Sequence, residues 1–404
     1  MSNKLLIARQ GSFWYINAMH REEGLSFRIT DKITDIHSQD WDRLFGKELI
    51  EGYGYHRTLQ ESGLKGFSFY YLLARRNNAI MAIIPFFTTV FSFSTTIQGG
   101  LQRLILGVQK IFPGFLKTPI LFVGNPTCEE LYLGVCETED QEALLKGAMD
   151  TLHSFCRNKK IGTMLFYNLT RRHSWLMRSL SRAGFRKMES FPNTEIRIKD
   201  ASLQDFISSL GKNTRKGIRR KLRDSRECAT LRTEVRSDIS GIENRIYELY
   251  LNNLTEGDVY FEILTPEFFR DICRNSEGTA RFFVTYAGDK IVAFNLLLIK
   301  GGRAIDKFVG FDREVSHKYN LYYATFAHNI DYCIKNGLCF YQMGITDYEP
   351  KVRLGSKLIP LYIYARFINP LLNLFTGIVI KLIEPKRFDP VLKRTAYAGD
   401  EPRL

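Results

Sequence analysis

The second half of the chain alternates apolar runs with short polar breaks, in an order that predicts helices, a strand meander, a helix and further strands. Two turn pairs, Gly288-Asp289 and Gly301-Gly302, separate three apolar runs, which is typical of consecutive hairpins. A helical spacing of apolar positions then ends at Asn336-Gly337. The predicted elements of this half are 242–254, 266–274, 281–286, 290–299, 303–310, 320–335, 338–343 and 358–366.

The first half shows the same order with weaker signals. Asn77-Asn78 joins two apolar runs and predicts a hairpin, and Gly184 ends a predicted helix. The stretch 95–124 has no clear pattern. The predicted elements are a helix at 41–49, strands at 68–75 and 79–88, a helix at 141–157, a strand at 162–168, a helix at 172–183 and a strand at 193–199. Because strands do not alternate strictly with helices, the pattern argues against a Rossmann sheet.

The composition and net charge indicate a folded protein with an anionic partner. Of the 404 residues, 45% are hydrophobic and 25% charged, which excludes a disordered chain, a collagen-like chain and a disulfide miniprotein. The formal net charge of +14 favours an anionic partner: nucleic acid, an anionic membrane or a phosphate-bearing cofactor. Seven scattered cysteines without a CxxC motif indicate a reducing cytosol, and His317 and His328 lie in no zinc-binding motif. We therefore expect no metal.

Membrane contact is expected to be peripheral at most. The N-terminus lacks a signal-peptide pattern, and no stretch of about 20 residues is free of both charges and helix breakers. The apolar segment 370–383 either docks on the protein's own surface or lies as an interfacial helix, followed by Lys386-Arg387. The sequence thus predicts a cytoplasmic protein, with contact to the inner face of a membrane as the alternative.

The strongest local charge lies in 212–226 (KNTRKGIRRKLRDSR), which holds eight basic residues and one acid. If this segment is helical, Ile218 and Leu222 form a small apolar stripe and the arginines occupy the other faces. One interpretation is phosphate capture, on CoA or on tRNA. The other is a solvated linker helix between domains.

A second charged cluster, Asp347, Tyr348, Glu349, Lys351 and Arg353, follows the predicted strand 338–343. Loops at strand ends commonly carry catalytic residues, but a charged surface turn shaped by a proline is an equal alternative. Asp306 and Lys307 interrupt another strand and face either a cleft or solvent. No GxxxxGK[ST] or GxSxG motif occurs, which argues against a P-loop nucleotidase and an α/β-hydrolase.

Three stretches resemble the Fem/CelD-like branch of the GNAT superfamily, namely 206–223, 282–310 and 329–355. That branch includes FemAB-type peptidoglycan aminoacyltransferases, cellulose-biosynthesis acetyltransferases and peptidogalycan biosynthesis/recognition proteins. Gly344, Asp347, Tyr348 and Lys351 fall on recurrent positions of the family. The resemblance covers most of 40–366. It implies an α/β fold of two tandem GNAT-like domains, 1–200 and 201–366, followed by a tail at 367–404.

The resemblance implies transfer of an acyl group from acyl-CoA to an amine. Under this hypothesis Asp347, or else Glu349, is the base, Lys351 stabilises the oxyanion or a donor phosphate, and Tyr348 protonates the leaving group. The donor would be held by Arg215, Lys216, Arg219, Arg223, Gly344 and Arg353. We expect only the second half to be catalytic.

Two alternatives remain open. The stretch 311–319 (FDREVSHKY) has no glycine where GNAT enzymes usually carry a pyrophosphate loop, which leaves room for an aminoacyl-tRNA donor and a cell-wall precursor as acceptor. The third hypothesis is a non-catalytic GNAT pair that binds RNA or an anionic membrane.

Overall fold

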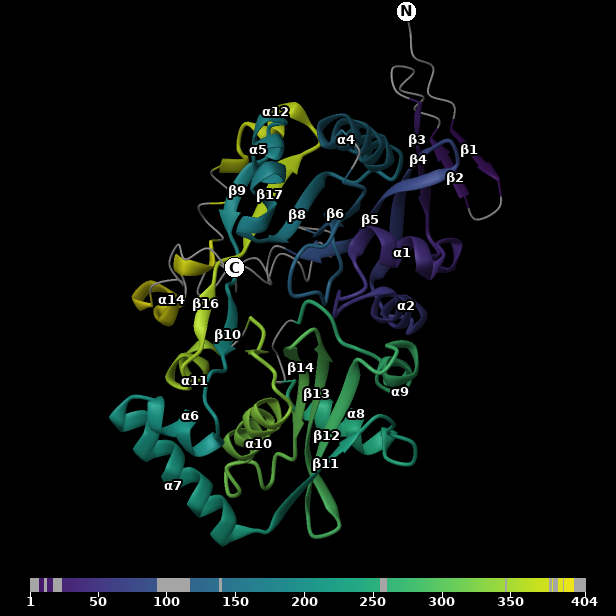
Figure 1. Cartoon of the computed structure of the whole chain (residues 1–404). Helices are drawn as coiled ribbons and strands as arrows, with labels where there is room; N and C mark the ends of the chain where they lie inside the picture. Colours follow the sequence, from purple (N-terminus) through teal and green to yellow (C-terminus); the bar gives the residue numbers. More distant parts are fainter. Residues whose placement is uncertain are drawn as a thin grey trace, which may run out of the picture. The chain divides into compact units, whose positions relative to one another are not determined.

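The computed structural model describes residues 7–10, 13–16, 24–92, 117–137, 140–254, 260–345, 347–377, 380, 384–387 and 389–395. The chain forms two compact units, each assembled from segments that are distant in the sequence (Figure 1). Unit 1 comprises the described parts of 1–47, 65–191 and 360–393, and unit 2 those of 48–64, 192–359 and 394–404. Most of the unassigned stretch 95–124, the N-terminal segment and part of the tail 370–383 lie outside the described residues.

Unit 1 is built on a ten-stranded mixed sheet with the order β1-β2-β3-β4-β5-β6-β8-β17-β9, and β7 pairs with β5. Neighbouring strands are antiparallel except β6 and β8, which are parallel. The strands are β1 Ile7–Gln10, β2 Phe13–Ile16, β3 Leu25–Thr30, β4 Phe67–Arg76, β5 Ala79–Ser92, β6 Lys117–Val123, β7 Gly134–Val135, β8 Thr163–Leu169, β9 Arg186–Glu189 and β17 Tyr362–Phe367.

Helices α4 and α5 of unit 1 and the hairpin β4–β5 confirm the predicted elements of the first half. Asn77 and Asn78 have φ values of 48° and 69°, as a tight hairpin turn requires. The apolar faces of α4 and α5 pack with β3, β5 and β8 in one buried cluster. The short and long helices of this unit are η1 Ile33–Asp35, α1 Ser38–Phe45, α4 Gln141–Asn158, η3 Arg171–His173, α5 Ser174–Arg182, α12 Pro370–Asn373, η4 Pro385–Arg387 and, at its end, α14 Pro390–Arg394.

Unit 2 contains a seven-stranded sheet with the order β11-β12-β13-β14-β15-β10-β16. The predicted meander is confirmed as β12, β13 and β14, which are antiparallel to one another. The strands are β10 Asn193–Arg197, β11 Leu231–Arg236, β12 Ala280–Ala287, β13 Lys290–Lys300, β14 Arg303–Phe311, β15 Phe340–Gln342 and β16 Lys357–Ile359. The helices are α2 Tyr53–Glu61, α6 Leu203–Ser209, α7 Lys212–Cys228, α8 Glu243–Asn252, α9 Pro266–Asn275, α10 Leu321–Lys335 and α11 Tyr348–Arg353.

Helices cover both faces of the unit 2 sheet. Phe282 of β12 contacts Phe269 of α9, whereas its neighbour Phe283 contacts Tyr332 of α10. Because consecutive strand residues point to opposite faces, α9 and α10 lie on opposite sides of the sheet. Each face of the sheet thus has a buried aromatic layer. A polar residue within such a layer is unusual and needs hydrogen-bond partners.

The strand predicted at 358–366 is wrong as a single element. The chain forms β16, which pairs with β10 in the unit 2 sheet, and then β17, which pairs with β8 and β9 in the unit 1 sheet. Pro360 lies between them and has no N–H to donate to a ladder, so one strand cannot run through it. The first part of this segment therefore belongs to the sheet of unit 2, and the second part belongs to the sheet of unit 1.

The pairing of β14 with β15 is short and positions the candidate site. These parallel strands pair only from Arg303 with Phe340 to Ile305 with Gln342, although β14 continues to Phe311. On its other side β14 pairs with β13, and the register shifts between Leu296 and Leu297. From Asp306 onward, β15 therefore no longer pairs with the edge of β14 that faces it.

Among the described residues, no helix is long and apolar enough to cross a bilayer. The tail nevertheless leaves large apolar side chains uncovered in its described part. Leu371, Leu372, Leu374 and Phe375 are 71%, 52%, 75% and 56% exposed. Docking of the tail on the protein, one of the two alternatives for 370–383, is thus wrong for these four side chains, whereas Ile380 is buried in a cluster with Met188 and Ala365.

Candidate functional site

Asp306 is the first residue of β14 beyond its pairing with β15, and its carboxylate oxygen Oδ1 is buried within unit 2. Its Oδ2 accepts hydrogen bonds from the Tyr341 hydroxyl at 2.6 Å and from Asn295 Nδ2 at 2.8 Å. Asn329 Nδ2 lies 3.4 Å from the same oxygen and donates at 3.0 Å to the Tyr341 hydroxyl. Three strands and α10 thus converge on one carboxylate.

Burial raises the pKa of Asp306 to about 6, because an apolar interior disfavours the charged form. The hydrogen bonds from Tyr341 and Asn295 and the positive charge of Lys351 act in the opposite direction and limit the rise of this pKa. Tyr341 stays protonated, since burial and the Asp306 charge hold its pKa well above the usual value. A carboxylate that titrates near 6 is suited to accept a proton at neutral pH.

The cluster has acceptor oxygens that the described residues leave without a partner. Asp306 Oδ1, Asn295 Oδ1 and Asn329 Oδ1 are all buried and accept no hydrogen bond. Buried acceptors are normally satisfied, so three in one polar cluster indicate a place for a bound donor such as an amine, an amide N–H or water. The site therefore fits a ligand that brings N–H or O–H groups.

Tyr322 connects this buried cluster with the predicted site on α11. The negative charges of Asp306 and Asp347 both raise the pKa of Tyr322, after burial as the main cause. Lys351 is 7% exposed, and its Nζ donates to the Met343 carbonyl at 2.5 Å while lowering the pKa of Asp306. Asp306, Tyr322, Asp347 and Lys351 thus share one electrostatic environment.

The other predicted residues of 344–353 have different settings. Gly344 has a φ of 71°, and its carbonyl accepts from the Thr194 hydroxyl at 2.7 Å. Tyr348 is buried, and its hydroxyl donates to the Pro192 carbonyl at 3.0 Å. Glu349 and Arg353 form an ion pair with side chains 61% and 68% exposed. Asp347 is exposed and precedes α11 with a φ of 51°.

The basic segment forms α7, which confirms the predicted helix. Ile218 is buried and Leu222 packs against the core, so one apolar stripe holds the helix on unit 2. Arg215 Nη1 donates to the Ser208 carbonyl at 2.7 Å, and Arg219 Nη2 donates to the Ser208 hydroxyl at 3.1 Å. The remaining predicted side chains are Lys216, which is exposed, and Arg223, which lies 3.5 Å from Asp224 and 3.7 Å from Glu227.

Helix α7 lies beside the first turn of α10. Lys221 Nζ is 3.6 Å from the ring centroid of Tyr323, which is the third residue of α10. In the preceding stretch without glycine, the backbone N–H groups of Ser316, Tyr319 and Asn320 donate to local carbonyls. These amides are therefore not available to a phosphate, whereas Lys221 of α7 lies near the start of α10.

Other ionisable residues of unit 2 lie outside this cluster. Lys307 Nζ and Glu51 Oε1 form an ion pair at 2.7 Å with side chains 1% and 0% exposed. The Nε2 atom of His328 on α10 is buried, and the imidazole ring contacts Phe283. Among the described residues, no group of three or more His, Cys, Asp or Glu side chains is placed to hold a metal ion.

The sequence did not single out the buried cluster. In the sequence, Asp306 stands out only as a charge inside a strand, and no motif includes Tyr341, Asn295, Asn329 or Tyr322. The available signal was a set of polar residues inside runs that are otherwise apolar, because such residues are buried only with partners. Which of them meet depends on strand order and register, which the pattern does not specify.

Comparison with known proteins agrees with this fold. The sequence model of the Acetyltransferase (GNAT) domain matches residues 212–352, a range that holds α7, the meander, α10 and the Asp306 cluster. The structure of FemX has a TM-score of 0.53 at 11% identity, covering 84% of this chain and 98% of FemX. A tandem GNAT protein from the clavulanic acid biosynthesis pathway has a TM-score of 0.51 at 10% identity, covering 86% and 99%.

A further structure, L-PGS from Bacillus licheniformis, has a TM-score of 0.51 at 15% identity over 85% of this chain and 95% of that chain. In sequence, the chain is 24% identical over 326 residues to the protein named "Putative 8-amino-7-oxononanoate synthase 2" of Mycobacterium tuberculosis. That match covers 78% of this chain, which spans less than half, 42%, of the relative.

These matches define a domain type within the chain. Residues 212–352 match the Acetyltransferase (GNAT) domain model, and the two sheets give the chain a mixed α/β fold. The resemblance to the Fem-like GNAT acyltransferases is confirmed, because the fold over both units is that of FemX and of a tandem GNAT protein.

Proposed function

We propose that unit 2 transfers an acyl group from acyl-CoA to an amine acceptor, with Asp306 as the general base. The observation that carries this proposal is a carboxylate with a buried, unpartnered oxygen and a pKa of about 6, placed where β14 and β15 stop pairing within the matched residues 212–352. The unpartnered oxygens of Asp306, Asn295 and Asn329 support an N–H donor as ligand.

The chemistry assigns one proton transfer to each of two residues. The amine nitrogen attacks the thioester carbonyl while its proton passes to the ionised Asp306 carboxylate. The tetrahedral intermediate then collapses, the C–S bond breaks, and the thiolate of CoA takes a proton. Tyr322 is suited to donate this proton, because burial and two neighbouring carboxylates keep it protonated. The products are an amide and free CoA.

The residues predicted on α11 take supporting roles in this proposal. Lys351 is buried beside the cluster, so its charge favours the ionised form of Asp306 and is suited to stabilise a developing oxyanion. Asp347 and Glu349 are exposed, which suits the binding of an acceptor better than proton abstraction in a dry site. Tyr348 already donates to Pro192 and fixes the start of α11.

We assign the donor phosphates to α7. The helix presents Lys221 close to the first turn of α10 and also carries Lys216 and Arg219, with Arg215 one turn before Arg219. Arginine and lysine bind phosphate by charge and by several N–H donors. Gly344 and Arg353, also predicted at the donor site, follow β15 and end α11. Phosphate binding by side chains is consistent with the absence of a glycine-rich loop at 311–319.

The direct test is calorimetric titration with acetyl-CoA and a long-chain acyl-CoA, followed by release of the CoA thiol in the presence of a panel of amines. We expect saturable binding that Arg219→Ala weakens and Asp306→Asn leaves intact. We expect turnover to fall about 100-fold or more with Asp306→Asn and much less with Asp347→Asn. Full turnover of Asp306→Asn would refute the assignment of the base.

The second candidate is an aminoacyl-tRNA donor, which the exposed cations of α7 also favour. A tRNA differs from CoA in the number of phosphates that it contacts, so its affinity falls more steeply with salt. Transfer of a labelled amino acid from tRNA, without any binding of acyl-CoA, would favour this donor. Salt-sensitive RNA binding without transfer of any group would favour a non-catalytic module.

Unit 1 also fits contact with an anionic membrane. The four exposed apolar side chains at 371–375 lie beside Gly184, because Asn373 Nδ2 donates to the Gly184 carbonyl at 3.1 Å. The surrounding α5 and β9 expose mainly cations: Arg178, Arg182, Arg186 and Lys187. An apolar patch within a basic rim matches an anionic lipid surface. Sedimentation with phosphatidylglycerol vesicles, reduced by Leu371→Ser, is the test.

A further inference from the structure

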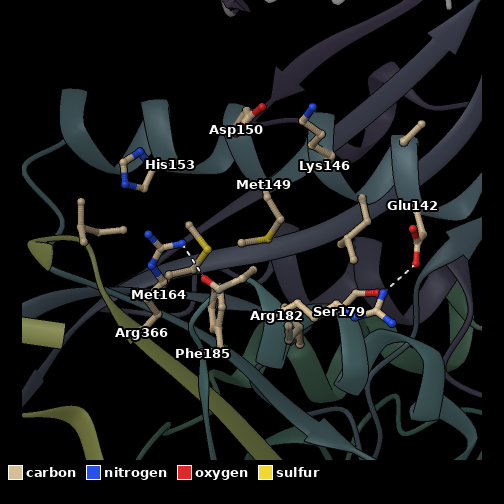
Figure 2. A pocket seen from close by; sticks show the side chains of 15 residues that line it. Glu142, Lys146, Met149, Asp150, His153, Met164, Ser179, Arg182, Phe185 and Arg366 are labelled. Carbon is tan, nitrogen blue, oxygen red and sulfur yellow. Dashed lines mark hydrogen bonds and ion pairs between the residues drawn. The ribbon is translucent and has the colours of Figure 1, made fainter. Parts of the chain in front are cut away.

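Unit 1 contains a groove that lies outside the GNAT domain match at 212–352. Helices α4 and α5 form its walls, and β8 and β17 contribute to its lining (Figure 2). Its volume is about 550 Å³. Small-molecule sites commonly have volumes of about 300–1,000 Å³, so the groove has the size of a ligand site.

The middle of the groove is mainly apolar, although Lys146 and Asp150 of α4 also line the groove. Figure 2 shows Met149 of α4 and Met164 of β8 in its central part, and Leu180 and Phe185 also line it. Methionine side chains adapt to irregular apolar ligands, because they are flexible and polarisable. The helical walls have their backbone groups hydrogen-bonded within α4 and α5, so the groove offers a peptide no backbone partners there.

The two ends of the groove differ in charge. At one end Glu142 and Arg182 form an ion pair at 3.1 Å, and their charges cancel (Figure 2). At the other end lie His153 and Arg366. Burial lowers the pKa of His153, and the charges of Arg157 and Arg366 lower it further against the weaker opposing effect of Asp150. That end therefore has a positive potential that an anion would relieve.

Arg366 is held in position with donors to spare. Its Nη1 donates to the Ala183 carbonyl at 2.9 Å, and the guanidinium lies 5.9 Å from the ring centroid of Phe185. Its Nε is buried without a partner among the described residues. A guanidinium has five N–H donors, so a fixed arginine with an unused buried donor is suited to bind a carboxylate.

We propose that this groove binds a single-chain amphiphile with an anionic head. The groove takes up this amphiphile as a single dissolved molecule and not as part of a membrane. The apolar chain lies over Met149 and Met164, and the anionic head contacts Arg366 and His153. The far end is closed to a second charged group by the Glu142–Arg182 pair. This site in unit 1 is independent of the proposed acyl transfer in unit 2, so either proposal can fail without the other.

The test is equilibrium dialysis of the full chain with labelled dodecanoate below its micelle concentration. We expect saturable binding of about one molecule per chain, and at least about tenfold weaker binding of dodecanol and of dodecylamine, because neither carries the anionic head. Met149→Trp fills the middle of the groove and should weaken dodecanoate binding at least about tenfold. Gln141→Trp adds the same side chain on α4 outside the groove lining and should leave binding unchanged.

Arg366→Lys keeps a positive charge but loses the guanidinium fork, and we expect it to weaken dodecanoate binding without affecting dodecanol. Circular dichroism and thermal melting check that each variant is folded. The proposal is overturned if the wild-type chain does not bind dodecanoate, if dodecanol binds as tightly, or if a folded Met149→Trp variant binds like wild type. It is also overturned if only phosphatidylglycerol vesicles bind, equally to wild type and Met149→Trp.

Discussion

Replacing Asp306 by asparagine should stabilise the protein at neutral pH while removing most of its activity. The substitution keeps the shape of the side chain and an acceptor for the Tyr341 hydroxyl, but it removes the charge. In the folded protein the pKa of Asp306 is about 6, against an ordinary value of 3.8. The folded state therefore holds the proton more tightly than the unfolded chain does, and ionisation of Asp306 opposes folding.

The magnitude and its pH range follow from this difference. One pKa unit corresponds to about 1.4 kcal/mol, so a rise from 3.8 to about 6 costs about 3 kcal/mol once both states are ionised. Proton binding by Asp306 stabilises the folded state relative to the ionised form. This stabilisation is fully present below the pKa of the unfolded chain and is lost as the pH rises through the pKa of the folded protein. Roughly half of the loss falls between about pH 5 and pH 8, where the protein can be handled conveniently.

The assay is urea unfolding of wild type and Asp306→Asn across this pH range, read by intrinsic fluorescence. We expect the variant to gain about 1–2 kcal/mol over wild type between pH 5 and pH 8. The matched control is Asp347→Asn, at an exposed carboxylate, which should change the unfolding free energy by less than about 0.5 kcal/mol throughout. If the difference between wild type and Asp306→Asn does not change with pH, the reasoning on a buried base fails.

The remaining predictions concern activity and packing. Turnover of the wild-type enzyme should rise with pH through about 6, since only the ionised Asp306 accepts a proton, and a flat profile would contradict this role. Arg219→Gln should raise the KM for acyl-CoA and flatten its salt dependence while changing kcat little, as initial rates at several salt concentrations will tell. Glu51→Gln removes the carboxylate from the buried ion pair with Lys307 and should cost about 3–5 kcal/mol in urea unfolding, whereas the double change with Lys307→Met should recover much of this loss. Gly217→Ala in α7 meets no neighbouring atom and should raise the unfolding free energy by up to about 1 kcal/mol; Gly310→Ala would place a Cβ 2.6 Å from the backbone of α8 and should lower the melting temperature instead.

The meander, α7 and α10 could be predicted from the sequence, because each depends on signals that are local. The hairpin turn at Asn77-Asn78 and the end of α10 at Asn336-Gly337 depend on residues next to one another in the chain. By contrast, the segment 358–366 was predicted as one strand, since its apolar alternation is continuous. Its division between two sheets depends on partners far away in the sequence, such as Asn193 for β16 and Met164 for β17.

The same distinction explains why the candidate base was not predicted. Asp347 stands among charged residues after a strand, so the sequence draws attention to it, but its side chain is exposed rather than enclosed by the fold. Asp306 stands in an apolar run and attracts attention only as an exception. Its chemistry comes from β13, β15 and α10, which bury it and supply donors to one oxygen but not to the other. The raised pKa of Asp306 means that its ionised form destabilises the folded protein. A catalytic or binding role would explain why the fold keeps an acid that lowers its stability.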